Sequence, residues 1–88
     1  MNIWVRYFKM IEYFSVVQFF EDKSYEYVRR HIDVESAIKV FQHYISSVSA
    51  KMGITARVII TDDGDCIVAE WIYEKGLVYP PKTQRAKG

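Results

Sequence analysis

The clearest alternation of apolar and polar positions runs from Ile54 to Tyr73, around the dipeptide Asp63-Gly64. Asp-Gly favours a two-residue β-hairpin loop because both residues tolerate the positive φ angles of a type I′ turn. Such a loop places Asp62 opposite Asp65 and Arg57 opposite Glu70. One face of the hairpin is then apolar and carries Ile54, Ala56, Val58, Ile60, Ile67, Ala69, Trp71 and Tyr73. The pattern predicts an antiparallel hairpin with this face buried and with Arg57 and Glu70 on the other.

A second hairpin is predicted upstream, over residues 11–32. Residues 11–20 have the composition of a strand, residues 21–24 are polar and suit a turn, and residues 25–32 form the returning strand. The alternation in the returning strand is poor. We expect Val28 and Ile32 to point inward, because an apolar residue before a helix cap often packs on the first turn. The residues expected to point outward are then Tyr25, Tyr27, Arg29 and His31.

A single helix is predicted between the two hairpins. Asp33 is a good N-cap, and Gly53 is a good C-terminal residue for a helix that runs to about Met52. Its apolar residues fall on one stripe that consists of Val34, Ala37, Ile38, Phe41, Ile45, Val48 and Met52. One apolar stripe predicts that the helix packs on one face of a sheet.

These elements predict an α+β domain in which a four-stranded antiparallel sheet carries one helix on one face, in the order strand, strand, helix, strand, strand. Residues 1–79 form this domain. Residues 1–10 are an extension of the first strand, an extra N-terminal strand or a tail, and the pattern leaves these alternatives open. Residues 80–88 follow Pro80 and Pro81 and are expected to be a flexible basic tail with Lys82, Arg85 and Lys87.

Composition narrows the class of protein. Half of the 88 residues are hydrophobic and 16% are aromatic, which excludes intrinsic disorder. The net charge of +1 provides no global field for nucleic acid or an anionic membrane. Arg6, Lys9 and Glu12 interrupt the apolar N-terminal stretch, so we expect no membrane partner. A single cysteine, Cys66, indicates a reducing compartment, and we expect a cytoplasmic protein.

Candidate catalytic and metal-binding groups are few. The aspartates around Gly64 fit a tight turn better than a calcium loop, which needs a longer segment and a later glutamate. His31, His43 and Cys66 are scattered without metal-ligand spacing. The sequence also lacks a glycine-rich phosphate loop and a nucleophile elbow. We therefore expect a protein that is not an enzyme and uses no cofactor or metal.

Residues suited to binding another macromolecule are more numerous than candidate catalytic or metal-binding groups. The outward side chains of the second strand interleave aromatic rings with cations, and the second hairpin adds aliphatic residues. The predicted binding face consists of Tyr25, Tyr27, Arg29, His31, Arg57, Ile59, Val68 and Ile72. Aromatic residues and arginine are enriched at protein interfaces, so we expect a protein partner, a homodimer, and a steric inhibitor or adaptor of the kind that phages and mobile elements encode. The alternative is a single-stranded nucleic-acid-binding protein that stacks bases on the tyrosines.

Overall fold

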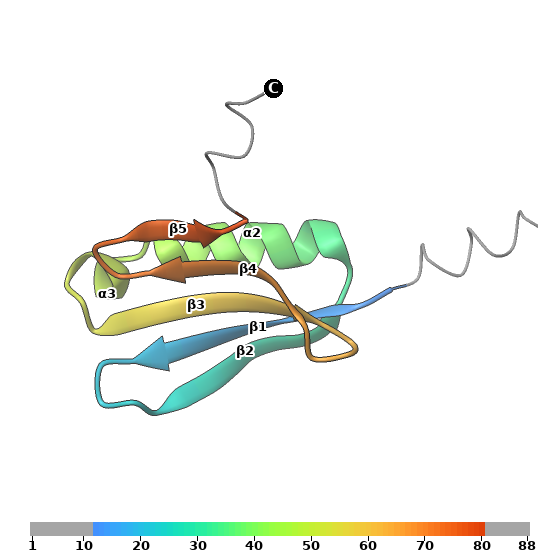
Figure 1. The fold of residues 1–88 in the computed structure, drawn as a ribbon, viewed down its shortest axis with the longest axis horizontal. Coiled ribbons are helices and arrows are strands. Elements are labelled where there is room, and N and C mark those ends of the chain that lie inside the picture. Colours follow the sequence, from blue (N-terminus) through green and yellow to red (C-terminus); the bar gives the residue numbers. More distant parts are fainter. Residues whose placement is uncertain (1–11, 81–88) are drawn as a thin grey trace, which may run out of the picture.

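Two antiparallel hairpins lie side by side in one sheet. The computed structural model describes residues 12–80, and the predictions for residues 1–10 and for the basic tail lie outside this range. The strands are β1 (Phe14–Phe20), β2 (Tyr25–Ile32), β3 (Thr55–Asp62), β4 (Ile67–Ile72) and β5 (Gly76–Tyr79), and the helices are α2 (Val34–Ile45) and α3 (Val48–Lys51). The strand order is β2-β1-β3-β4-β5, and all neighbours are antiparallel (Figure 1). The predicted small α+β fold is confirmed, but the described sheet has five strands because residues 76–79 pair with β4.

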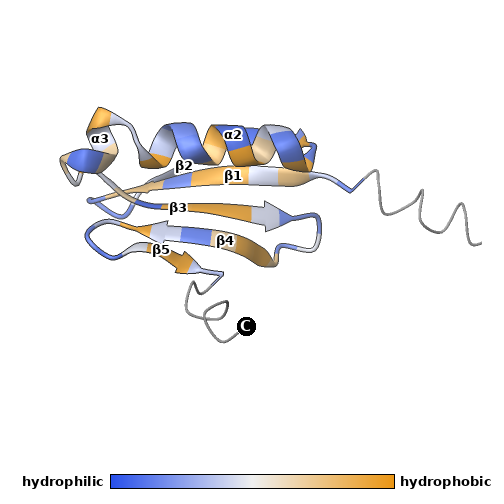
Figure 2. Cartoon of the chain, turned by 90° about the horizontal axis from the view of Figure 1, so that it is seen from above, coloured by the Kyte–Doolittle hydropathy of each residue, from blue (hydrophilic) through white to orange (hydrophobic). Residues whose placement is uncertain are grey.

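The core lies between α2 and one face of the sheet. Val16 of β1 and Val58 of β3 are fully buried, and Phe41 and Ala37 of α2 pack on them. α2 contacts β1, β3 and β2. Figure 2 shows both helices on one side of the sheet. The pattern of the β3–β4 hairpin is confirmed in part on this face: Ile60, Ala69 and Trp71 also join the core, but Ile54 and Ile67 are exposed.

The predicted continuous helix is wrong, because two serines interrupt it. The Ser46 hydroxyl donates to the carbonyl oxygen of Gln42 at 2.8 Å, and the Ser47 hydroxyl donates to that of Tyr44 at 2.7 Å. Ser47 then caps α3, because its Oγ accepts a hydrogen bond from the backbone N–H of Ala50 at 3.2 Å. Serine hydroxyls compete in this way for the backbone groups that would otherwise continue the helix.

The predicted helix stripe is also partly wrong. Ala37 and Phe41 face the sheet as expected, but Val34 and Ile38 are exposed, and Val40 packs against the core instead. α2 lies over β2, β1 and β3, so the side of the helix that carries Val40 and Tyr44 turns toward β2. Val48 and Met52 are exposed because they follow the interruption.

The loop of the β3–β4 hairpin differs from the expected two-residue turn. The backbone N–H of Asp62 donates to the carbonyl oxygen of Cys66, and Asp65 adopts a φ of 63°. The Asp62 carboxylate accepts hydrogen bonds from the backbone N–H groups of Gly64 and Cys66, which closes this longer loop. A further register shift lies between Thr61 and Ile60. Together with the longer loop, it makes Arg57 pair with Ile72 and not with Glu70. Between residues 57–60 and 69–72 the total shift is two residues, so the faces predicted for these parts of the strands are unchanged.

Candidate binding face and a hollow beside the helix

The face of the sheet that points away from α2 is built by cross-strand pairs. Phe19 of β1 pairs with Tyr25 of β2 and with Arg57 of β3, while Val17 pairs with Tyr27 and Ile59. Paired residues point to the same side of a sheet, and this side is opposite to the one that carries Val16 and Val58. We call this surface the open face. It consists of Val17, Phe19, Tyr25, Tyr27, Arg57, Ile59, Glu70 and Ile72, and the alternation along β4 adds Val68, which has no paired residue in β3.

Aromatic rings and arginines form a connected row across the open face. The ring centroids of Phe19 and Tyr25 lie 5.6 Å apart, and those of Tyr25 and Tyr27 lie 6.2 Å apart in an edge-on arrangement. The Arg30 guanidinium lies 4.1 Å from the centre of the Tyr27 ring, and the Arg57 guanidinium lies 4.8 Å from that of Phe19. Arginine over an aromatic ring is an attractive cation–π arrangement.

Arg57 and Glu70 form an ion pair in the middle of this face. Arg57 Nε and Glu70 Oε2 are 2.6 Å apart, and the pair is diagonal because Glu70 lies opposite Ile59. It is the only ion pair among residues 12–80. The charge of Arg57 is thus balanced within the face.

The accessible part of the open face is mainly aromatic. Val17 and Ile59 lie on it but are only 3% and 6% exposed, because the larger side chains around them cover them. Tyr25 and Tyr27 are 62% and 41% exposed, and Val68 is also exposed on β4. The two tyrosines therefore form the most prominent edge of the face.

Arg29 is not placed as the sequence predicted. The β1–β2 register shifts on both sides of Val16, so Arg29 pairs with Val16 on the helix side of the sheet. Arg30 takes the expected place beside Tyr27. His31 has a φ of 58° and stacks on Tyr13 with a centroid distance of 4.1 Å. This irregularity explains why apolar and polar residues alternate poorly over residues 25–32.

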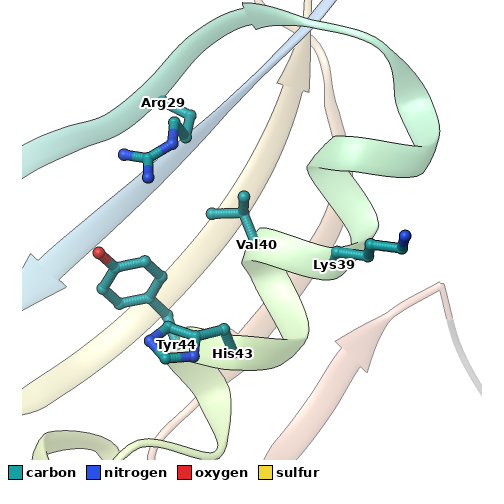
Figure 3. Close-up of a pocket in the computed structure, with 5 residues that line it drawn as sticks. All are labelled: Arg29, Lys39, Val40, His43 and Tyr44. Carbon is teal, nitrogen blue, oxygen red and sulfur yellow. The ribbon is translucent and has the colours of Figure 1, made fainter.

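On the helix side, a hollow of about 240 Å³ lies between β2 and α2. It is lined by Arg29, Lys39, Val40, His43 and Tyr44 (Figure 3). Figure 3 shows the Arg29 guanidinium and the Tyr44 hydroxyl on the same side of Val40, with Lys39 extending in the other direction. The sequence pattern does not predict this set, because it places Arg29 on the other face of its strand.

Within residues 12–80, no group of three or more His, Cys, Asp or Glu side chains is placed to hold a metal ion. Cys66 is an exposed free thiol. None of the described helices has the length and apolar composition needed to span a membrane.

The chain matches no protein-family model, and comparisons with curated proteins and with solved structures also find no match.

Proposed function

We propose that this chain is a non-catalytic binding module that uses the open face to contact a protein partner. The observation that carries the proposal is the exposure of Tyr25 and Tyr27, with the Arg30 guanidinium over the Tyr27 ring. Tyrosine and arginine are among the residues that dominate the energetics of protein interfaces. A row of rings already packed on one another also loses little conformational entropy on binding.

The charges on the open face favour a protein over a nucleic acid. Arg57 is paired with Glu70, and Arg29 lies on the helix side of the sheet. Arg30 is then the cation beside the tyrosines that is left for a phosphate contact. The Glu70 carboxylate lies on the same face, where its negative charge disfavours a phosphate backbone. Nucleic-acid binding without sequence preference draws most of its affinity from several phosphate contacts.

The proposed mechanism is steric and involves no turnover. The module covers a surface of its partner and thereby acts as an inhibitor or an adaptor. A second copy that docks on the same face would produce a homodimer. The exposed thiol of Cys66 fits a reducing compartment, and we propose the cytoplasm.

Site-specific photo-crosslinking tests this proposal. A benzophenone amino acid replaces Tyr27 in one variant and Val48 of α3 in a control, because Val48 is also exposed but lies on the helix side. Irradiation of cells that make each variant should give a discrete protein adduct at position 27 that is absent at position 48. Light scattering on the purified chain then shows whether the partner is a second copy.

A benzophenone at Val68 should give the same adduct when both tyrosines are present, and the variant Tyr25→Ala/Tyr27→Ala with the benzophenone at Val68 completes the experiment. Losing two exposed rings should leave the circular dichroism spectrum unchanged and should remove the adduct. A protein adduct that persists in this variant, or the absence of any protein adduct at position 27, contradicts the proposal.

A second candidate function rests on the Arg30–Tyr27 contact alone. A guanidinium beside an exposed ring also suits a base stacked on the ring with its phosphate on the cation. Fluorescence titration with a mixed-sequence single-stranded oligonucleotide tests this candidate. Affinity that falls steeply as salt is raised supports nucleic-acid binding, and no binding at low salt excludes it.

A further inference from the structure

The hollow between β2 and α2 has the composition of an anion site. Three of its lining side chains, Arg29, Lys39 and His43, are basic, and none is acidic. Tyr44 adds a hydroxyl, and Val40 supplies an apolar wall. A volume of about 240 Å³ is smaller than that of the clefts that enclose a drug-sized ligand. It suits a small anion or a single anionic group of a larger ligand.

Arg29 is the strongest candidate to anchor an anion. Its Nη1 donates to the carbonyl oxygen of Val28 at 2.7 Å, and this contact positions the guanidinium beside the hollow. A guanidinium has five N–H donors, so most of them are left for a ligand. Among residues 12–80 the only ion pair joins Arg57 to Glu70, and Arg29 has no carboxylate partner there. The planar fork of arginine matches two oxygens of a phosphate group.

The other polar groups have smaller roles. The pKa of Asp33 is lowered chiefly by its hydrogen bonds with Ser36 and to a lesser extent by the charge of Lys39. The charge of Lys39 therefore also acts on the Asp33 carboxylate at the start of the helix, and its role in the hollow is smaller. The His43 ring lies edge-on to the Tyr44 ring at 5.0 Å, which helps to hold the tyrosine in place. The Tyr44 hydroxyl and the Arg29 guanidinium approach the hollow from different elements, so the fold is needed to bring them together.

We propose that this hollow binds a phosphate group, with Arg29 as its main ligand, Tyr44 as a hydrogen-bond donor and Lys39 as a peripheral cation. Free phosphate and a phosphorylated serine share this chemistry. The proposal does not depend on the function assigned to the open face, because the two surfaces lie on opposite sides of the sheet.

Titration followed by ¹H–¹⁵N NMR tests the site with two probes, inorganic phosphate and a phosphoserine peptide. Sodium chloride of equal ionic strength and the unphosphorylated peptide are the controls. Phosphate should shift the backbone amides of residues 28–30 and 39–44, whereas chloride should not. Tighter binding of the phosphopeptide would assign the site to a phosphorylated side chain, and equal or weaker binding would assign it to the free anion.

Adjacent arginines provide matched variants. Arg29→Gln and Arg30→Gln remove the same charge from neighbouring positions, but Arg30 lies over Tyr27 on the open face. Arg29→Gln should weaken phosphate binding by about tenfold or more, since charge-assisted hydrogen bonds are lost, and Arg30→Gln should change it by less than about twofold. Equal losses in the two variants, or no phosphate-specific shift at these amides, would overturn the proposal.

Discussion

Arg29 and Arg30 are adjacent in sequence and serve different surfaces. Regular alternation would also separate them, but it would place Arg29 with Tyr25 and Tyr27 on the open face. The register shifts around Val16 reverse this assignment, so that Arg30 contacts Tyr27 and Arg29 reaches the hollow. One irregularity in the backbone therefore decides the chemistry of two surfaces.

Gln18 and Thr55 form a buried polar contact of a different kind. The Thr55 hydroxyl donates to Gln18 Oε1 at 2.6 Å, and both residues are buried although they are 37 positions apart. The residues next to Gln18 and Thr55 in the sequence do not predict this contact, because it depends on how β1 pairs with β3.

The first stability prediction concerns this pair. Thr55→Val keeps the shape of the side chain but leaves Gln18 without its buried partner, so it should lower the free energy of unfolding by about 1–3 kcal/mol in urea titrations. Replacing both residues, as in Gln18→Leu/Thr55→Val, removes both polar groups and should recover most of this loss. A double variant whose loss of stability equals the summed losses of Thr55→Val and Gln18→Leu would show that the hydrogen bond is not the cause.

At the scale of elements, hairpins and helix caps are readable from the sequence because they are local. Asp33 caps α2 as predicted, with its Oδ1 accepting from the backbone N–H of Ser36 at 2.9 Å. The rotation of α2 about its own axis is not readable in the same way. Val34, Ile38 and Val40 are all apolar, and only contact with β2 selects Val40 for the core.

Truncations one turn apart test this rotation of α2. Phe41 is 5% exposed in the core, so Phe41→Ala should cost about 3–5 kcal/mol, a large part of the stability of a domain this size. Ile38 is 44% exposed, so Ile38→Ala should cost less than about 1 kcal/mol. Chemical denaturation of both variants provides the measurement, and similar losses would contradict the observed orientation.

The cap of α2 should also make stability depend on pH. Hydrogen bonds from Ser36 lower the pKa of the Asp33 carboxyl in the folded state. The resulting stabilisation is complete above the pKa of the unfolded chain and is lost as the pH falls through the lower, folded value. Asp33→Asn removes this carboxylate, so the difference in stability between wild type and variant should shrink in unfolding measurements from neutral pH to about pH 3. Asp63→Asn makes the same change of charge in the hairpin loop and controls for net charge, and a difference that stays constant for Asp33→Asn would rule out this role of the cap.

At the scale of the whole molecule, the class of fold follows from sequence and the candidate sites follow only in part. Turn residues, caps and β-branched runs act over short distances, which is why both hairpins and the start of the helix are predicted. The surfaces depend on long-range register. Tyr25 and Tyr27 lie on the open face, whereas the hollow appears only when β2 and α2 are brought together.

The irregular path of β2 also bears on how the molecule avoids self-association through its backbone. β2 and β5 are the outer strands of the described sheet, and an outer strand that is long and straight is a template for aggregation. β2 is bent by its register shifts and by the positive φ of His31, and β5 has only four residues. Neither strand presents a straight row of backbone groups to another chain. The shifts that relocate Arg29 thus also make β2 a poor template for the addition of another strand.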